Sequence, residues 1–290
     1  MKIVVAIDGS PHATRALAWA VEEAELRSAA LTVLHAFGVG RLAGALDGGT
    51  AAERREAEAI ELVRHALDPW TTSGVDADIA VAPALGRQVA GALLHHARDA
   101  DLLVLGSRGL GGFPGLLLGS VSQQVVTHAS VPVAVIPYVD GAAIPPVTTS
   151  VVVGIDGSPS SRRALEWGAE EARLRDVPVE AVLVRPAVDP VTSDASASEL
   201  ASLDEQADEG ARRRLLTIIR DTLGVRGTDV LPRVLAGQAA HVLVTVAARS
   251  SSLVVVGSRG REGFAGLLLG SVSMQCLTHA RGPVVVIHGS

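Results

Sequence analysis

A segment of seventeen residues occurs twice in this chain, and this duplication limits the possible folds more than any other feature. The copies are residues 106–122 and 257–273, which lie 151 positions apart and share 14 identical residues. Both contain the pattern G-x2-G-x9-G-S, and both follow an apolar run. A strand that leads into spaced glycines and then into a helix start brings backbone amides against a phosphate. We interpret this segment, which we call the glycine ladder, as a duplicated nucleotide-binding element.

The repeat extends over nearly the whole chain. VVAIDGSP at 4–11 recurs as VVGIDGSP at 152–159, an offset of 148 at the aspartates (156 − 8 = 148). The ladders have the larger offset of 151, so the second half contains an insertion of three residues (151 − 148 = 3). Each repeat is about 140 residues long, a usual size for a domain with its own core. We predict domains at 1–138 and 150–290, joined by a linker at 139–149.

Short apolar runs alternate with segments of helical spacing in each repeat. In the first repeat, the predicted strands are 3–7, 31–36, 75–82, 102–105 and 133–136. The predicted helices between them are 11–27, 53–67, 88–98 and 121–128. Such alternation is typical of a parallel sheet with right-handed crossovers and helices on both faces. The predicted fold is α/β, with two tandem doubly wound domains, each an open five-stranded parallel sheet in the order 3-2-1-4-5.

An aspartate and the ladder follow two different strands of each predicted sheet. Asp8 and Asp156 end the first strands, and Gly106 and Gly257 end the fourth. Where strand order reverses, the carboxyl ends of neighbouring strands face one crevice. A carboxylate accepts hydrogen bonds from ribose hydroxyls, whereas a helix start favours an anion. The pattern therefore predicts a nucleotide with its ribose at the aspartate and its phosphates at the ladder.

Two structural alternatives stay open for these motifs. Asp8 can stabilise the turn into the following helix, because aspartate readily bonds nearby backbone amides. The ladder glycines can serve loop flexibility alone. The second copy replaces Leu110, Gly111 and Pro114 but keeps every glycine and serine of the G-x2-G-x9-G-S pattern. That selectivity favours nucleotide binding.

The composition limits the classes of binding partner and the cellular compartment that we expect for this chain. The net charge is −6 and the isoelectric point about 5.8, so no basic footprint for nucleic acid is present. Cys276 is the only cysteine, which excludes an intrachain disulfide and favours a reducing compartment. No apolar run approaches the roughly 20 residues of a membrane span, and the N-terminus has no signal-peptide pattern. We expect a cytoplasmic protein that binds neither nucleic acid nor membrane.

On these motifs the chain resembles the universal stress protein family in its tandem, two-domain form. The resemblance covers nearly the whole chain and rests on V-A-I-D-G-S-P and V-G-I-D-G-S-P, on D-L-L-V-L-G-S-R-G, on the ladder, and on V-P-V-A-V-I and G-P-V-V-V-I near the repeat ends. The ladder is typical of the family's ATP-binding branch. The resemblance therefore implies one ATP per repeat, with Mg²⁺ held, if at all, through the ATP phosphates and no metal site of the protein's own.

The resemblance also implies which residues bind the nucleotide. Asp8 would hold the ribose, and Ala36, ending the second strand, would line the adenine pocket. The remaining residues of the first repeat are Gly106, Arg108, Gly109, Gly119, Ser120, Val121 and Ser122. Those of the second repeat are Asp156, Val184, Gly257, Arg259, Gly260, Gly270, Ser271, Val272 and Ser273.

Several features of phosphoryl-transfer enzymes are missing from the sequence. It contains no G-x4-G-K-[ST] motif, and no second carboxylate lies close to the ladder in both repeats. We therefore expect an ATP-binding stress or signalling regulator with an unidentified protein partner, and no catalytic residues. The alternatives are a slow ATPase or adenylate-transferring enzyme, or two empty relic sites. The apolar last strands predict pairing at sheet edges, either between the two domains or in a homodimer.

Overall fold

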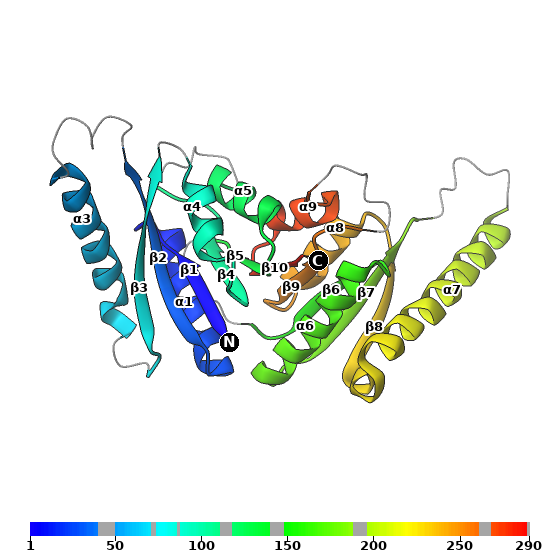
Figure 1. The fold of residues 1–290 in the computed structure, drawn as a ribbon. Coiled ribbons are helices and arrows are strands. Elements are labelled where there is room, and N and C mark those ends of the chain that lie inside the picture. Colours follow the sequence, from blue (N-terminus) through cyan, green and yellow to red (C-terminus); the bar gives the residue numbers. More distant parts are fainter. Residues whose placement is uncertain are drawn as a thin grey trace. The chain divides into compact units, whose positions relative to one another are not determined.

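A computed structural model describes residues 1–39, 50–70, 74–85, 88–110, 118–139, 148–187, 196–260 and 268–288. The chain divides into two compact units, Met1–Val147 and Thr148–Gly289. Each unit has its own parallel sheet and its own set of helices (Figure 1).

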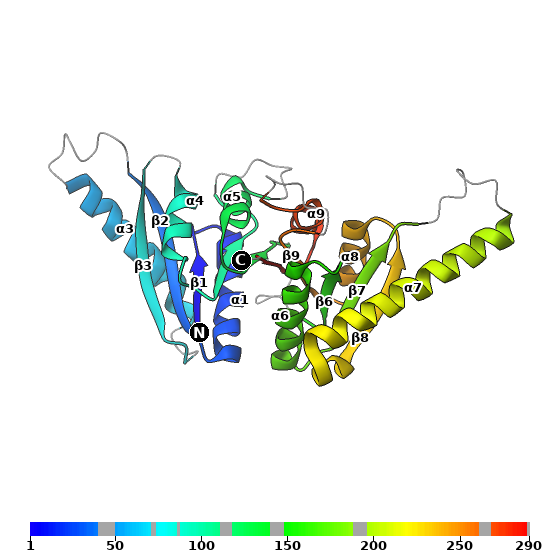
Figure 2. The same ribbon diagram turned by 45° about the vertical axis from the view of Figure 1, so that its right-hand side comes forward.

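The first unit is a five-stranded parallel sheet in the order β3-β2-β1-β4-β5. Its strands are β1 (Lys2–Ala6), β2 (Ala30–Val39), β3 (Ala77–Leu85), β4 (Leu102–Gly106) and β5 (Val133–Ile136). Its helices are α1 (Pro11–Arg27), α3 (Thr50–Leu67), α4 (Val89–His96) and α5 (Ser120–His128), with a short 3₁₀ helix at Asp68–Trp70. Helices α1 and α3 cover one face of the sheet, and α4 and α5 cover the other (Figure 2).

The second unit repeats this arrangement in the order β8-β7-β6-β9-β10. Its strands are β6 (Val151–Ile155), β7 (Val179–Arg185), β8 (Val230–Ala236), β9 (Leu253–Gly257) and β10 (Val284–Ile287). Its helices are α6 (Pro159–Arg175), α7 (Ala197–Leu223), α8 (Ala239–Ala248) and α9 (Ser271–His279), with a 3₁₀ helix at Gly224–Asp229. The predicted fold class and strand order are therefore confirmed in both units.

The chemistry of the first strand and helix explains why this part of each unit folds as it does. The side chains of β1 from Ile3 onward are buried, as expected for a strand covered on both faces. The Ser10 hydroxyl then accepts a hydrogen bond from the Ala13 N–H, 3.2 Å away, and Pro11 is the first helical residue. Ser158 caps α6 in the same way. The turn that carries the aspartate is thus held at a fixed angle to the sheet.

Several predicted boundaries are wrong. The third strand is predicted at 75–82 but β3 is Ala77–Leu85, and the ends of α3 and α4 differ from the predictions by up to three residues. The end of the second strand bears on the site. The sequence predicts that the second strand ends at Ala36, but β2 continues to Val39 because its pairing with β3 continues as far as Leu85. Ala36 therefore lies inside the strand. In the second unit the matching Val184 lies next to the last residue of β7, Arg185.

Two further features concern membrane-spanning helices and the cysteine. In the described part of the chain, every helix is too short or too polar to cross a bilayer. Cys276, on α9, is buried, and burial raises the pKa of its thiol to about 12. A thiol with so high a pKa stays protonated near neutral pH, so Cys276 acts as a packing residue.

Candidate nucleotide site

Each unit has a pocket at the carboxyl ends of its central strands. In the first unit the pocket has a volume of about 440 Å³ and lies between the ends of β1 and β4, the start of α5 and helix α4. In the second unit it has a volume of about 380 Å³ and lies between the matching elements, β6, β9, α9 and α8. Both volumes are in the range of small-molecule sites, and both pockets lie at the point where strand order reverses.

All eighteen residues predicted from the sequence line these two pockets. Those in the first unit are Asp8, Ala36, Gly106, Arg108, Gly109, Gly119, Ser120, Val121 and Ser122. Those in the second are Asp156, Val184, Gly257, Arg259, Gly260, Gly270, Ser271, Val272 and Ser273. The structure therefore brings together, in each unit, residues that are about a hundred positions apart in the sequence.

Asp8 joins the turn after β1 to the ladder. Its Oδ1 accepts a hydrogen bond from the Ser10 N–H at 3.1 Å, and its Oδ2 accepts one from the Leu110 N–H at 2.9 Å. The turn-stabilising role left open by the sequence is therefore present. It does not exclude a ligand, because each carboxylate oxygen has a second lone pair that can accept from a ribose hydroxyl.

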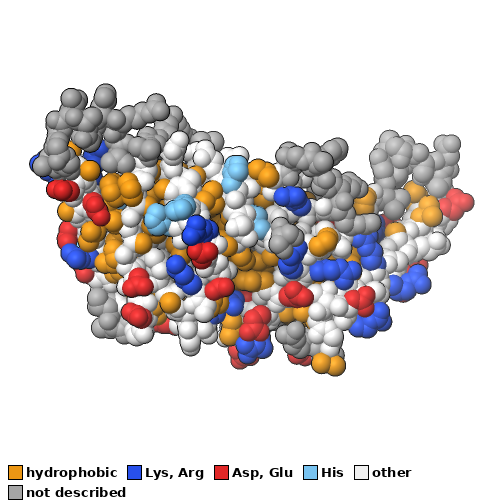
Figure 3. Space-filling model, viewed as in Figure 1, with side chains coloured by type: hydrophobic (Ala, Val, Ile, Leu, Met, Phe, Trp, Pro, Cys, Tyr) orange, Lys and Arg blue, Asp and Glu red, His pale blue; other side chains and the backbone are white. Residues whose placement is uncertain are grey.

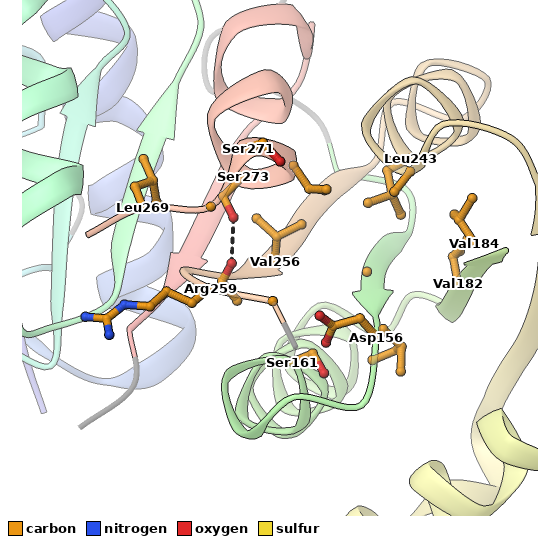
Figure 4. A pocket seen from close by; sticks show the side chains of 17 residues that line it. Asp156, Ser161, Val182, Val184, Leu243, Val256, Arg259, Leu269, Ser271 and Ser273 are labelled. Atoms are coloured by element: carbon orange, nitrogen blue, oxygen red, sulfur yellow. Dashed lines mark hydrogen bonds between the residues drawn. The ribbon is translucent and has the colours of Figure 1, made fainter. Parts of the chain in front are cut away.

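Asp156 repeats the first of these contacts in the second unit. Its Oδ1 accepts a hydrogen bond from the Ser158 N–H at 2.9 Å. In Figure 4 the Asp156 carboxylate lies on one side of the pocket, with Ser271 and Ser273 of α9 on the other. The pocket thus has a carboxylate and a helix start at separate places, as the sequence predicts.

The second ladder glycine makes room for this carboxylate. A methyl group at Gly109 would lie 2.2 Å from the Asp8 Oδ2, and one at Gly260 would lie 2.8 Å from the Asp156 Oδ2. Neither glycine has a positive φ. The need for glycine at these two positions is therefore one of space rather than of backbone conformation.

The first ladder glycine is needed for packing. A methyl group at Gly106 would lie 2.8 Å from the carbonyl carbon of His12, and one at Gly257 would lie 2.8 Å from that of Ser160. The end of β4 or β9 therefore touches the first turn of α1 or α6 directly. Although both glycines also line the pockets, this close helix–strand approach is sufficient to explain them.

The ladder ends at the first turn of a helix whose amides face the pocket. The first backbone bond within α5 runs from the Gln123 N–H to the Gly119 carbonyl, and in α9 from the Met274 N–H to the Gly270 carbonyl. The three preceding N–H groups of each helix therefore have no acceptor within the helix. Together with the helix dipole, they favour an anion at this end of the pocket.

The last ladder serine bonds to the strand rather than into the pocket. The Ser122 hydroxyl donates to the Gly106 carbonyl at 2.8 Å, and the Ser273 hydroxyl donates to the Gly257 carbonyl at 2.6 Å (Figure 4). These bonds fix the helix start against the end of β4 or β9. Ser122 and Ser273 therefore contribute to the site chiefly through their backbone amides.

The units share an arginine in the ladder, Arg108 or Arg259, but differ beside the first ladder glycine, where His12 in the first unit matches Ser160 in the second. In Figure 4 the Arg259 side chain extends away from Asp156. In the first unit, His12 Nδ1 lies 3.1 Å from the Ser107 Oγ, behind the ladder. Burial and, to a lesser degree, Arg108 lower the pKa of His12, while Asp8 opposes that shift.

Each pocket is also lined by apolar helix residues that the sequence does not single out. These are Val89 and Leu93 of α4 in the first unit, and Ala239 and Leu243 of α8 in the second. Each pair has a spacing of four, which is also the spacing of an ordinary core-facing helix stripe. A sequence signal therefore exists, but it does not separate a ligand pocket from a core.

The remaining surface gives no second cluster of metal-ligating side chains. Within the described ranges, no group of three or more histidine, cysteine, aspartate and glutamate side chains is placed to hold a metal ion. On the face shown in Figure 3, acidic and basic side chains lie among one another.

Known proteins place this site in a family. The family model described as the universal stress protein family matches residues 1–137 and 148–288. The chain belongs to the universal stress protein family. Universal stress protein Rv1996 of Mycobacterium tuberculosis is 35% identical over 305 residues, which cover 98% of this chain and 94% of that protein. Universal stress protein Rv2005c of the same organism is 36% identical over 295 residues, covering 99% and 97%.

Solved structures of universal stress proteins have the same fold. A crystal structure from Archaeoglobus fulgidus covers 99% of this chain and 96% of its own, with a TM-score of 0.69 and 18% identity. Another universal stress protein from this organism, in complex with dAMP, covers 49% of this chain with a TM-score of 0.34 and 26% identity. That likeness is too low to bear on the ligand of this chain.

Proposed function

We propose that this universal stress protein binds one ATP in each unit and acts as a nucleotide-dependent regulator of a stress or signalling response. The observation that carries the proposal is the presence, in each pocket, of a carboxylate and of a helix start whose first N–H groups have no acceptor within the helix. A carboxylate suits ribose hydroxyls and repels phosphate, whereas the helix start attracts phosphate. A molecule that has both groups at a fixed separation is a nucleotide.

ATP fits these pockets in one orientation. The ribose would lie at Asp8 or Asp156, and the phosphates at the first turn of α5 or α9. The base would then occupy the apolar end, between the second strand and helix α4 or α8, beside Ala36 or Val184. A magnesium ion would be held by the ATP phosphates, since each pocket has only one carboxylate among its described lining residues.

Two measurements test nucleotide binding directly. Protein purified without added nucleotide is denatured and the released small molecules are identified, and nucleotide-free protein is then titrated with ATP by calorimetry. We expect adenine nucleotide in the first experiment and two ATP per chain in the second. Because a ligand that binds only the folded state stabilises it, ATP should also raise the melting temperature. No released nucleotide, no titration heat and no thermal shift would together support relic sites.

A slow ATPase or adenylate-transferring enzyme is the second candidate for the same pockets. Efficient phosphoryl transfer needs a group that orients the attacking water in addition to groups that hold the phosphates. Asp8 and Asp156 are the only carboxylates among the described lining residues, and they lie at the proposed ribose end. We expect fewer than about one turnover per minute with ATP and magnesium, far below the usual enzyme range. Several turnovers per minute would contradict a purely regulatory role.

The partner, the assembly and the compartment are also part of this proposal. We expect ATP to change the affinity for an unidentified protein partner in the cytoplasm. Pairing through the last strands, β5 and β10, stays a prediction. Light scattering with and without ATP would test whether two chains associate.

A further inference from the structure

The second unit has another cavity beside its nucleotide pocket. This cavity, which we call the annexe, has a volume of about 680 Å³. It shares four lining residues with the nucleotide pocket, namely Ile155, Asp156, Val184 and Gly260. Its other walls come from the end of β7 and from α7, including Arg185 and Arg214. The annexe therefore opens at the proposed ribose position and beside the ladder.

Arg214 is fixed at this opening by one hydrogen bond. Its guanidinium donates to the backbone carbonyl of Asp156, and its Nη2 lies 3.1 Å from where a methyl group at Gly157 would stand. A guanidinium has several N–H donors and a flat face, and the bond to Asp156 uses one donor. The side chain is exposed, so its remaining surface is available to a ligand.

The charges around the annexe argue against a phosphate as its occupant. The Arg185 guanidinium lies 2.7 Å from the Asp204 carboxylate and 2.5 Å from the Asp208 carboxylate, so its charge is already compensated. The Asp156 carboxylate, which also lines the annexe, would repel a phosphate lying there. The annexe is therefore a cavity of about 680 Å³ with partly apolar walls, and the planar guanidinium of Arg214 is among its lining groups. A planar, uncharged ring matches these features, because aromatic rings stack on guanidinium planes.

We propose that the annexe binds a second nucleobase, so that the second unit accepts a dinucleotide, meaning two nucleosides joined through phosphates. The first nucleoside would occupy the nucleotide pocket, as in the proposed function on which this inference rests. Gly260 lines both cavities. The phosphates would run from the ribose toward the first turn of α9, so the chain must be long enough to turn back past Gly260 and place the second base at Arg214.

The first unit has a different residue at the same place. There, Leu62 of α3 lies beside Gly9. A methyl group added at Gly9 would lie 3.5 Å from the Cδ1 of Leu62. Gly9 matches Gly157 in sequence, and Leu62 stands where Arg214 stands in the second unit. A leucine offers no stacking plane and no donor. Dinucleotide selectivity should therefore be a property of the second unit.

The test compares ATP with diadenosine tetraphosphate as the probe. The full-length Gly109→Ala variant, which weakens the first site, is titrated with both ligands by calorimetry. We expect the dinucleotide to bind about tenfold more tightly than ATP, which is the effect of about 1.4 kcal/mol. Arg214→Leu, which introduces the residue of the first unit, should remove this advantage and leave ATP affinity within about twofold. Arg214→Lys keeps the charge but loses the plane, and it should also remove most of the advantage.

The outcomes separate this inference from the proposed function. If the Gly109→Ala chain binds neither ligand although it is folded by circular dichroism, nucleotide binding in the second unit is wrong. If it binds ATP but binds the dinucleotide no better, or if Arg214→Leu or Arg214→Lys retains the full advantage, the second base is not held by stacking on Arg214. Leu62→Arg, in the first unit, is the matched control and should leave both affinities of the Gly109→Ala chain unchanged.

Discussion

The two units share the backbone of their nucleotide pockets but differ in the side chains around it. In both units the aspartate after the first strand accepts from the serine two residues on, and the last ladder serine donates to the first ladder glycine. Around them, His12 in the first unit corresponds to Ser160 in the second. Leu62 in the first unit lies beside Gly9, as Arg214 in the second unit lies beside the matching Gly157. The shared aspartate, ladder and helix start are the groups that the ribose and phosphates of a nucleotide would touch. The residues that differ surround them.

The long helix before the third strand differs most. Helix α7 has 27 residues and α3 has 18. Arginine contacts tie α7 to its sheet, through Arg185 with Asp204 and Asp208 and through Arg214 with the Asp156 carbonyl. The framework that the two units share depends on backbone geometry, so the flanking helices differ in length and side chains while the framework stays the same. The predictions below test which differences matter.

The largest effect is expected where the two units are most alike. Gly106→Ala and Gly257→Ala each place a methyl group within 2.8 Å of helix backbone. Because backbone cannot move away as a side-chain end can, each substitution should lower the free energy of unfolding by about 1–3 kcal/mol. Urea unfolding of the full chain, followed by circular dichroism, measures this loss.

A matched control uses a glycine with open space around it. Gly210 lies inside α7, and a methyl group there would meet no atom within 4 Å. Gly210→Ala should therefore stabilise the second unit by up to about 1 kcal/mol through higher helix propensity. If Gly257→Ala unfolds at the same urea concentration as the unchanged chain, the close contact between β9 and α6 is wrong.

The next effect concerns the second ladder glycine and nucleotide binding. Gly109→Ala and Gly260→Ala should each weaken ATP binding in their own unit by about tenfold or more, equivalent to about 1.4 kcal/mol. The reason is that the new methyl group displaces the carboxylate proposed to hold the ribose. The new methyl group would lie closer to the Asp8 Oδ2 in the first unit (2.2 Å) than to the Asp156 Oδ2 in the second (2.8 Å), so Gly109→Ala should have the larger effect. Calorimetric titration would show one strong site in each single variant and none in the double variant; two unchanged sites in the double variant would contradict the assigned geometry.

These glycines also show what the sequence could predict. The alternation of strands and helices predicted the fold, and the duplicated motifs predicted the two aspartates and the ladder's place at a helix start. The full set of eighteen pocket residues, which includes Ala36 and Val184, came from the resemblance to the family. The duplicated motifs are readable because they describe backbone conformation and spacing, which survive sequence divergence. The apolar wall formed by Val89 and Leu93 was missed, because its helical spacing is the same as that of a core. The annexe was missed because Arg214 is one of several exposed arginines in a helix that aligns poorly with α3.

A smaller effect is expected for the aspartates, and it separates their two roles. Asp8→Asn keeps an oxygen that can accept from the Ser10 N–H, but it removes the negative charge. If Asp8 holds the ribose, ATP affinity in the first unit should fall by about threefold to tenfold, or about 0.7–1.4 kcal/mol. The preference for ATP over its 2′-deoxy form should fall with it. Asp156→Asn should do the same in the second unit. An unchanged ATP affinity together with a lower melting temperature would mean that the carboxylate serves the turn alone.

The smallest expected effect comes from the pair His12 and Ser160. Burial, and secondly Arg108, lower the pKa of His12 in the folded chain, with Asp8 opposing them. Protonation therefore favours the unfolded state, and the first unit should lose stability as pH falls below about 6.5, the usual histidine value. His12→Ser, which introduces the residue of the second unit, should flatten this loss. The acid-induced loss in the free energy of unfolding should differ between the unchanged chain and His12→Ser by well below about 1 kcal/mol, because solvent screens a half-exposed ring.

The measurement for His12 is the urea midpoint at about pH 8 and about pH 5.5, a range in which histidine titrates. The ring also lies 5.1 Å from that of Tyr138, so His12→Ser removes packing at both pH values. Only the difference between the two pH values reports on the charge. If the unchanged chain and His12→Ser lose the same stability on acidification, another group causes the acid sensitivity. The first unit would then owe none of its pH response to His12, the residue that matches Ser160 of the second unit.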